Sequence, residues 1–279
     1  MKLCYLPVEF CLHFESPAYA DVYPPFIMRS LLGCNLRKMC CVAHTNECSE
    51  CMYNRTCAYS TIFETIISGE NNILPGTVRA SHPFAITDNT RLDSKKRVLS
   101  DYRLTITLMG HTIEYLPYIY AAIARAGKGG MFKSRTPFEV TDIKVGGQSI
   151  LLDPENIQTD VPIMEFNSDS FTGEKRGDVL VELITPMRFK IGGKYASDFS
   201  ADEFFTCISR RMKNLCTMYG ESDDKSFLER SEIEISMVNK NLRWNDYRHY
   251  SGRQKTAMEL GGVTGTFTLR GNFSKNNIN

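Results

Sequence analysis

The order of its periodic hydrophobic patterns is the feature that most constrains the fold of this chain. Apolar residues occupy every second position over residues 6–14, a period that predicts a half-buried strand. Over residues 28–39 they recur every three or four positions, which predicts an amphipathic helix. The patterns that follow predict strands near residues 79–86 and over 102–108, a helix over 117–126 and a strand over 138–145.

This succession of strand, helix, two strands, helix and strand is the βαββαβ arrangement of a ferredoxin-like unit. After a polar stretch the order begins again, with a strand within residues 179–191. Ser200 and Glu203 have the spacing of a capping box at the start of a helix, and Gly220 is placed to end that helix. Strands over residues 233–237 and 263–269 follow.

The sequence therefore predicts an α+β protein of two tandem ferredoxin-like (RRM-like) units, the second incomplete at its carboxy-terminal end. We expect an amino-terminal unit over residues 1–147 with a cysteine-rich insertion at about residues 40–60. A connector over residues 148–177 and a carboxy-terminal unit over residues 178–279 follow. Because many functions use this fold, the fold class alone selects none of them.

Charge is balanced over the chain of 279 residues, whose formal net charge is +1, but its distribution is uneven. From Lys240 onward seven basic residues are accompanied by two acidic ones, so this end carries a net charge of +5. A basic end favours a polyanionic partner such as nucleic acid, although an ordinary solvated surface explains it equally well. No apolar run reaches eighteen residues and no signal-peptide pattern opens the chain, so we expect a cytoplasmic protein without membrane contact.

Six of the ten cysteines gather between residues 34 and 57. Four of them have the spacing C-x6-C-x2-C-x5-C: Cys41, Cys48, Cys51 and Cys57. A Cys-x2-Cys pair is common in tetrahedral zinc sites, so we expect these four side chains to bind a structural zinc ion. Cys40 could replace Cys41, and His44 could replace one of the cysteines. An iron–sulfur cluster and a set of free thiols are the alternatives.

Four stretches of the chain, taken together, resemble one family. The first joins Arg-Ser-Leu-Leu-Gly at residues 29–33 to Ala-Tyr-Ser-Thr-Ile-Phe-Glu at 58–64. The second contains Leu-Met-Gly at 108–110, Gly-Lys-Gly-Gly at 127–130 and Arg-Thr-Pro-Phe at 135–138. The third is Thr-Pro-Met-Arg at 185–188. The fourth contains Arg-Trp-Asn-Asp at 243–246, Tyr-Ser-Gly-Arg-Gln at 250–254 and Gly-Gly-Val-Thr-Gly at 261–265.

In this order and spacing the chain resembles the CRISPR-associated endoribonucleases that process precursor CRISPR RNA, a family of the RAMP superfamily. The resemblance covers nearly the whole chain and implies the same tandem ferredoxin-like fold that the periodicity predicts. It departs at the carboxy-terminal end, where family members carry a second helix and a glycine-rich loop. This chain has Asn-Phe-Ser-Lys-Asn-Asn-Ile-Asn at residues 272–279 instead.

The resemblance implies an endoribonuclease that binds CRISPR repeat RNA and cleaves precursor CRISPR RNA without a metal ion. The 2′-hydroxyl of the RNA attacks the adjacent phosphorus and leaves a 2′,3′-cyclic phosphate and a 5′-hydroxyl. This reaction needs a base, an acid and cations near the phosphate. The candidate catalytic residues are His44, Tyr23 and Lys38, with His249 as a rival histidine.

Each of these candidates has a competing interpretation. His44 follows the first helix, where the family often carries its catalytic histidine, but a zinc ligand or a loop residue is the alternative. His249 lies in the most basic segment, where it could contact phosphate or occupy a solvated strand position. Tyr23 could orient the 2′-hydroxyl or pack against its neighbours, and Lys38 could contact phosphate or lie on a solvated helix end.

The resemblance also implies RNA contacts from both units, since the glycine-rich turn at residues 127–130 combines close backbone approach with positive charge. The candidate RNA-binding residues are Lys128, Gly129, Gly130, Lys133, Arg135, Arg188, Arg248, Arg253, Gln254 and Lys255. No small-molecule cofactor is expected.

Two other functions stay open on the sequence alone. One is a non-catalytic CRISPR repeat-RNA-binding module or a subunit of a CRISPR effector complex. The other is a zinc-stabilised assembly protein that binds no RNA. Cleavage distinguishes the nuclease from the binding module, and salt-dependent RNA binding distinguishes the module from the assembly protein.

Overall fold

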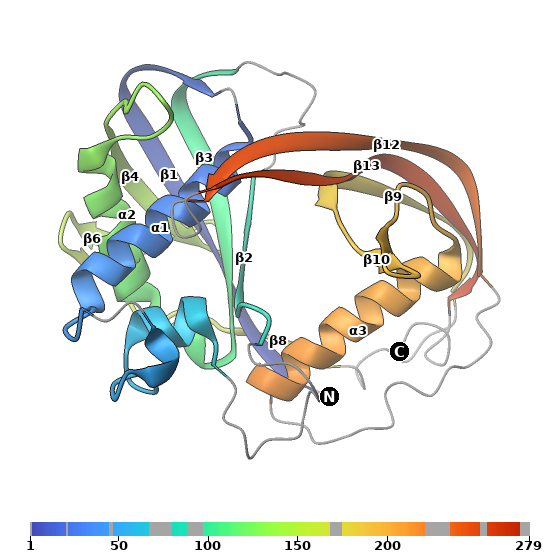
Figure 1. Ribbon diagram of the computed structural model, residues 1–279, viewed down its shortest axis with the longest axis horizontal. Helices are drawn as coiled ribbons and strands as arrows, with labels where there is room; N and C mark the ends of the chain where they lie inside the picture. Colours follow the sequence, from blue (N-terminus) through green and yellow to red (C-terminus); the bar gives the residue numbers. More distant parts are fainter. Residues whose placement is uncertain are drawn as a thin grey trace. The chain divides into compact units, whose positions relative to one another are not determined.

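The computed structural model describes residues 2–20, 22–44, 47–66, 80–88, 97–167, 175–220, 235–251 and 256–273. It describes the side chains at these positions except at 97, 175, 247–251 and 256–260. The chain divides into two compact units (Figure 1). We call them the amino-terminal unit, mainly Leu3–Asn89 and Asp93–Glu165, and the carboxy-terminal unit, mainly Phe166–Asn279.

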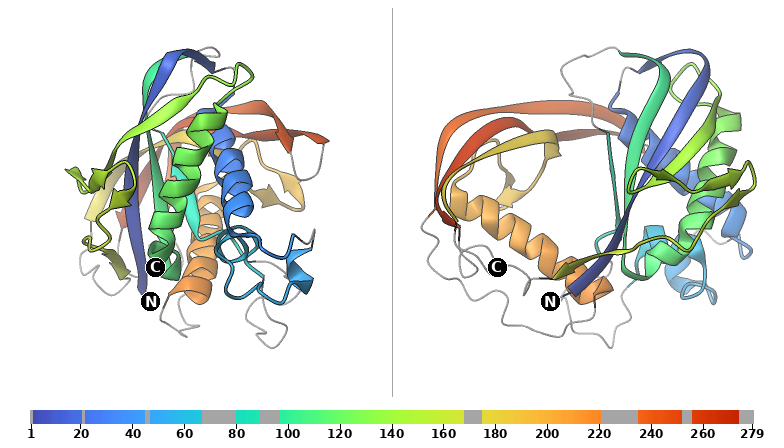
Figure 2. Two further views of the ribbon diagram at one scale, coloured as in Figure 1. Left: turned by 90° about the vertical axis from the view of Figure 1, so that its left-hand side faces the viewer. Right: turned by 180° about the vertical axis from the view of Figure 1, so that it is seen from behind.

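The amino-terminal unit contains β1 (Lys2–Ala20), α1 (Pro24–Cys40), β2 (Phe84–Thr87), β3 (Arg97–Met109), α2 (Leu116–Gly129) and β4 (Phe138–Val145). Its antiparallel sheet has the order β2–β3–β1–β4, extended by β5 (Gln148–Ser149), and β8 (Met164–Asn167) also pairs with β1. The two helices lie side by side along the sheet (Figure 2). This is the strand order of a ferredoxin-like unit, so the predicted fold of this unit is confirmed.

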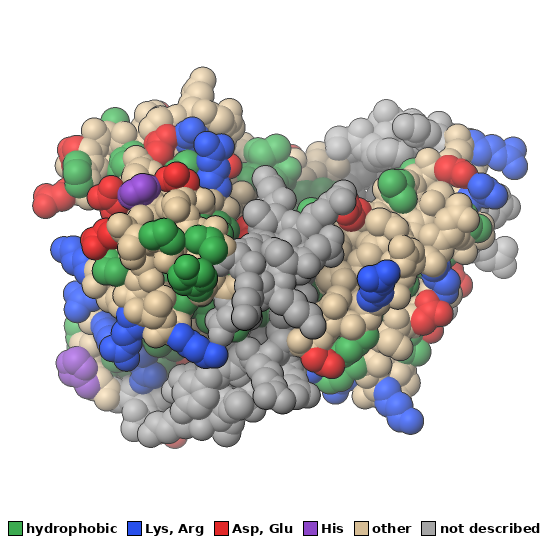
Figure 3. All heavy atoms as spheres, turned by 90° about the horizontal axis from the view of Figure 1, so that it is seen from above, with side chains coloured by type: hydrophobic (Ala, Val, Ile, Leu, Met, Phe, Trp, Pro, Cys, Tyr) green, Lys and Arg blue, Asp and Glu red, His purple; other side chains and the backbone are tan. Residues whose placement is uncertain are grey.

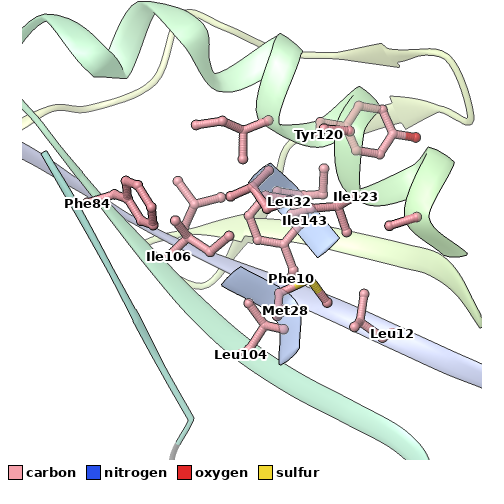
Figure 4. Packing of buried hydrophobic residues seen from close by; sticks show 14 of the residues in the cluster. Phe10, Leu12, Met28, Leu32, Phe84, Leu104, Ile106, Tyr120, Ile123 and Ile143 are labelled. Carbon is pink, nitrogen blue, oxygen red and sulfur yellow. The ribbon is translucent and has the colours of Figure 1, made fainter. Parts of the chain in front are cut away.

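The core of the amino-terminal unit follows the predicted alternation. Phe10 and Leu12 from β1, and Leu104 and Ile106 from β3, point to the same side of the sheet and are fully buried. Met28 and Leu32 of α1 and Ile123 of α2 pack against them (Figure 4). Burial of these side chains at a spacing of two along the strands and three to four along the helices holds the helices on the sheet.

Short elements connect the main ones. A 3-10 turn (Cys48–Glu50) and a π-helical turn (Ser60–Glu64) lie within or beside the cysteine-rich segment, and a second 3-10 helix (Gly110–Tyr115) joins β3 to α2. Further short strands fall in the segment predicted as a connector: β6 (Leu151–Asp153) and β7 (Asn156–Ile157), which pair with each other.

The carboxy-terminal unit contains β9 (Lys175–Met187), α3 (Ala201–Tyr219), β12 (Ile235–Ser251) and β13 (Thr256–Phe273). A small hairpin of β10 (Lys190–Ile191) and β11 (Lys194–Tyr195) lies between β9 and α3 in the sequence. The sheet order β12–β13–β9 is the order of strands two, three and one in a ferredoxin-like sheet. The described part of this unit thus carries the first four elements of the fold, as predicted.

Aromatic side chains form the core of the carboxy-terminal unit. Phe267 of β13 is fully buried, and its ring centroid lies 5.0 Å from that of Phe204 on α3 and 5.7 Å from that of Phe199. Both pairs meet edge to face, which is a favoured geometry for aromatic rings. These rings attach α3 to the sheet.

The predicted capping box begins α3. The backbone N–H of Glu203 donates to the Ser200 hydroxyl at 3.3 Å, and the backbone N–H of Ser200 donates to the Glu203 carboxylate at 2.8 Å. Gly220 follows the helix as predicted, but its backbone is extended rather than left-handed. Glycine is needed there because a Cβ would collide with the carbonyl oxygen of Cys216.

Strands β12 and β13 are far longer than the sequence patterns predict, and irregular backbone explains the difference. The register shifts between Val238 and Asn241, and Asn239 adopts a left-handed φ of 52°. On the partner strand Gly265 has φ 124°. A bulge moves successive side chains to different faces, so one alternating pattern does not run through the whole strand.

In the described residues, no helix combines the length and the apolar character that crossing a membrane requires.

Candidate functional site

The carboxy-terminal end of α1 carries two of the predicted catalytic side chains. Lys38 lies in the last turn of the helix, and His44 follows four residues after the helix ends. Both side chains are exposed. His44 has a left-handed φ of 49°, an uncommon conformation for a residue other than glycine, so the chain turns sharply at the histidine. A cation and an imidazole are thus presented to solvent from one end of one helix.

Tyr23 lies at the other end of α1, where it precedes the first helical residue. At about 1.5 Å per residue, Tyr23 and Lys38 are about 22 Å apart along the helix axis. The Tyr23 ring is buried, meets Phe26 edge to face at 5.2 Å, and its hydroxyl accepts the backbone N–H of Asp88 at 3.4 Å. The structure therefore does not bring Tyr23 together with Lys38 and His44, and its surroundings favour a packing role.

The glycine-rich segment at residues 127–130, which closes α2, is surrounded largely by the protein's own backbone. A Cβ on Gly127 would collide with the carbonyl oxygen of Phe138, and one on Gly130 would collide with that of Arg135. Gly130 also has a left-handed φ of 75°. Around Gly129, by contrast, no atom lies within 4 Å of the Cβ position. Of these three glycines, Gly129 alone offers open space to a ligand.

A tight hairpin follows the turn and displays basic side chains. Met131 and Thr136 exchange backbone hydrogen bonds of 2.9 and 3.1 Å, and the hairpin tip lies between them. Lys133 and Arg135 on the hairpin are exposed, as is Lys128 in the last turn of α2. Exposed cations on a hydrogen-bonded hairpin can contact phosphate with little loss of backbone entropy.

The cysteine-rich segment does not show the predicted zinc site. Among the residues that the structure describes, no group of three or more His, Cys, Asp or Glu side chains is placed to hold a metal ion. All four predicted ligands are described, and they are free cysteines. Burial raises the pKa of the Cys48 thiol, with a further increase from Glu64. The predicted zinc site is not supported.

Other features stabilise the end of the cysteine-rich segment. The guanidinium of Arg37 lies 5.6 Å from the centroid of the Tyr59 ring, and the Tyr59 hydroxyl donates to the buried carboxylate of Glu64 at 3.2 Å. These contacts link the last turn of α1 to the π-helical turn at Ser60–Glu64. They attach the segment to the amino-terminal unit.

In the carboxy-terminal unit the structure describes the side chain of Arg188, which is exposed and lies over the ring of Tyr195. Arg248 and His249 belong to β12, but their side chains are outside the described residues. Arg253, Gln254 and Lys255 are outside the described residues altogether. Basic and acidic side chains are interspersed on the face shown in Figure 3.

One exposed histidine with a carboxylate partner was missed by the sequence analysis. His13 Nδ1 on β1 lies 2.8 Å from the carboxylate of Asp101 on β3. This hydrogen bond raises the pKa of His13 above its ordinary value. The pairing of His13 with Asp101 follows from the register of β1 and β3, and alternation places both residues on the outer face of the sheet. That register was the only signal that could have revealed the pair.

Comparison with known families decides what kind of chain this is. The model of the AF_1859_N N-terminal domain matches residues 3–162, and the model of the CRISPR-associated endoribonuclease Cas6 matches residues 181–278. Residues 181–278 therefore form a Cas6-family domain. The Cas6 match includes α3, β12, β13 and the small hairpin, so the exposed Arg188 and Tyr195 lie within the Cas6 domain. The family resemblance that the sequence motifs predicted is confirmed.

One solved structure with a TM-score above 0.5 supports the fold, and others are similar at lower scores. A Cas6 product complex is 14% identical in sequence, with a TM-score of 0.51, over 96% of this chain and 85% of that chain. Thermus thermophilus Cas6 is 13% identical with a TM-score of 0.49, covering 99% of this chain and 87% of that one. An RAMP protein binding different RNA substrates is 15% identical with a TM-score of 0.41, covering 95% and 88%. No curated protein matches the sequence.

Proposed function

We propose that this chain is an endoribonuclease that binds CRISPR repeat RNA and cleaves precursor CRISPR RNA without a metal ion. The observation that carries the proposal is the Cas6 domain match over residues 181–278, joined to a complete ferredoxin-like unit. The exposed cations of the hairpin after α2 and of the end of α1 support it, because phosphate contacts position an RNA strand.

In the proposed reaction the RNA supplies its own nucleophile. A base removes the proton of the 2′-hydroxyl, the 2′-oxygen attacks the adjacent phosphorus, and the bond from phosphorus to the 5′-oxygen breaks. An acid gives a proton to the departing 5′-oxygen, which leaves a 2′,3′-cyclic phosphate and a 5′-hydroxyl. A metal ion is not needed to balance this reaction.

We assign the acid–base step to His44 and the charge stabilisation to Lys38. His44 is exposed and carries an imidazole, a group that can act as a general acid or base. Lys38 lies in the same exposed region at the end of α1, where an ammonium group can stabilise the negative charge that develops on the phosphate. His249 remains the alternative histidine.

The test is cleavage of a labelled CRISPR repeat RNA in EDTA by the wild-type chain and by His44→Ala, His249→Ala and Lys38→Ala variants. Loss of the acid–base histidine is expected to slow cleavage by about 10²- to 10⁴-fold. His111→Ala, which changes an exposed histidine outside the proposed site, is the matched control and should cleave at the wild-type rate. A repeat RNA with a 2′-deoxy nucleotide at the cleavage position should stay intact.

Cleavage that requires a divalent cation, or that leaves the 2′-deoxy RNA cut, would contradict the mechanism. Tight binding of the repeat RNA by a folded chain that does not cut it would instead favour the second candidate. That candidate is a non-catalytic repeat-RNA-binding module or a subunit of a CRISPR effector complex, and the same exposed cations support it.

A further inference from the structure

The small hairpin of the carboxy-terminal unit gathers two cations on one aromatic ring. The guanidinium carbon of Arg188 lies 3.9 Å from the centroid of the Tyr195 ring, and Lys190 Nζ lies 5.1 Å from it. The strand register pairs Lys190 with Tyr195 across the hairpin. Gly192 and Gly193 form its turn, both with left-handed φ values of 55° and 82°. The ring and the guanidinium therefore belong to one short, sharply turned segment.

The hairpin is attached to the core, so the cluster is held in position. The backbone N–H of Ala196 donates to the carbonyl oxygen of Phe189 at 3.1 Å, and the Phe189 ring meets that of Phe199 at 5.2 Å. Ile191 packs against the same core. Tyr195 itself points outward and is 48% exposed. A large aromatic side chain is thus kept half in solvent on a supported backbone.

Trp244 of β12 extends the aromatic surface. Its ring centroid lies 6.5 Å from that of Tyr195, with an angle of 43° between the planes. The indole N–H donates to the Asp246 carboxylate at 2.7 Å, which fixes the orientation of the tryptophan. Arg188, Tyr195 and Trp244 therefore form a row of planar groups, which we call the stacking row.

Charge around the stacking row is positive. Between Met187 and Ser197 there are three basic residues, Arg188, Lys190 and Lys194, and no acidic residue. Asp198 is paired with Lys240 at 2.7 Å, whereas the Asp246 carboxylate, which accepts from the Trp244 indole, is one negative charge beside these three cations. Like charges crowded on one hairpin repel one another, and an anion bound among them removes that repulsion.

We propose that the stacking row binds an unpaired RNA base on Arg188 and Tyr195, with Lys190 and Lys194 contacting the adjacent phosphates. This inference rests on the proposed function for its ligand, and it specifies the form of RNA that this unit takes. Bases of unpaired RNA stack on aromatic rings and on guanidinium planes, whereas a duplex keeps its base faces covered. An acidic peptide would meet the cations but would leave the planar groups unused.

The test uses an unstructured oligouridylate that carries 2-aminopurine, whose fluorescence falls when the base stacks, and it uses the full chain. Tyr195→Leu removes the ring and keeps an apolar side chain, and it is expected to weaken binding by about 5- to 100-fold and to abolish the fluorescence change. Tyr195→Phe keeps the ring and should retain both. Tyr118→Leu is the matched control, since Tyr118 on α2 is 49% exposed and should tolerate the change.

The cations are tested by salt dependence. Lys190→Gln should lower the slope of log affinity against log salt concentration by about 0.7, the value for one phosphate contact on a single strand. Arg188→Lys keeps the charge but not the plane, so it should keep the slope and lose part of the fluorescence change.

Equal binding by Tyr195→Leu and the wild-type chain, or failure of the wild-type chain to bind the oligouridylate at all, would overturn the inference. Because the oligouridylate is not a repeat RNA, the result is separate from the cleavage test. Tyr195-dependent binding by a chain that does not cut repeat RNA would uphold the stacking row and reject the proposed nuclease. If the Tyr195→Leu variant cleaves repeat RNA and binds the oligonucleotide as the wild-type chain does, the proposed nuclease is upheld and the stacking row is rejected.

Discussion

The backbone carbonyl oxygen of Arg135 occupies the space where a side chain on Gly130 would begin. Gly130 also has φ 75°, so Gly130→Ala is expected to destabilise the chain by about 1 kcal/mol or more through collision and backbone strain. At Gly129 an added Cβ would meet no atom within 4 Å beyond its own stretch of helix backbone. Because Gly129 lies at the end of a helix, Gly129→Ala should leave the stability unchanged or raise it by up to about 1 kcal/mol. The free energies of unfolding of the two variants, measured by urea denaturation, test this difference.

The same pair of variants also tests the RNA contact. If RNA approaches the backbone at Gly129, then Gly129→Ala should weaken repeat-RNA binding without loss of stability. Unchanged affinity in this variant would remove the turn from the RNA interface, and the exposed Lys133 and Arg135 would have to act without it.

The capping box at the start of α3 should contribute measurably to stability. Ser200→Ala removes the acceptor of the Glu203 backbone N–H, which is expected to cost about 1 kcal/mol. Ser197→Ala changes an exposed serine just before the helix and should alter the free energy of unfolding by less than about 0.5 kcal/mol. Equal midpoints for the two variants in urea would show that the cap contributes nothing.

The core of the carboxy-terminal unit depends on Phe267. Phe267→Ala leaves a cavity facing Phe199 and Phe204 and should destabilise this unit by about 3–5 kcal/mol. Thr268→Ala, at the next position of β13 and on the opposite face of the sheet, should have a small effect. Fluorescence of Trp244, the single tryptophan, reports on this unit selectively, and a loss below about 1 kcal/mol would contradict the packing.

The pair formed by His13 and Asp101 should be sensitive to pH. The hydrogen bond to Asp101 raises the pKa of folded His13 above the ordinary 6.5, so the pair stabilises the fold fully below that pH. The contribution is lost as pH rises through the folded pKa. We expect an NMR titration of His13 to give a raised pKa that returns toward 6.5 in Asp101→Asn, and this variant to lose stability at pH 5.5 but not at pH 9. An unchanged titration in the variant would refute the assignment.

The amino-terminal unit could be predicted from the sequence because its strands bury one face. Leu104, Ile106 and Leu108 alternate with polar residues and are all buried, so the pattern reports the structure directly. The order of helices and strands along the chain then indicates the topology, since βαββαβ units share one order of strands in their sheet. The long β12–β13 hairpin was underpredicted because its bulge near Asn239 breaks the alternation.

The candidate site was less predictable because it depends on contacts that no local pattern encodes. Arg188 and Tyr195 meet only because a two-residue strand pairs Lys190 with Tyr195, and two residues are too few to show a period. In the same way, the glycines at residues 127–130 indicate, from the sequence alone, a backbone that a ligand could approach closely. The folded chain uses Gly127 and Gly130 to admit its own carbonyl groups.

The register shift between Val238 and Asn241 divides the β12–β13 hairpin into two ladders of hydrogen bonds. The described hairpin residues that belong to the core all lie within residues 235–244 of β12 and 263–273 of β13. Both ladders contain core residues, since Leu242 and Val263 lie on one side of the shift and Met237 and Leu269 on the other. One core therefore holds both ladders, and hydrogen exchange should show protected amides on both sides of the shift.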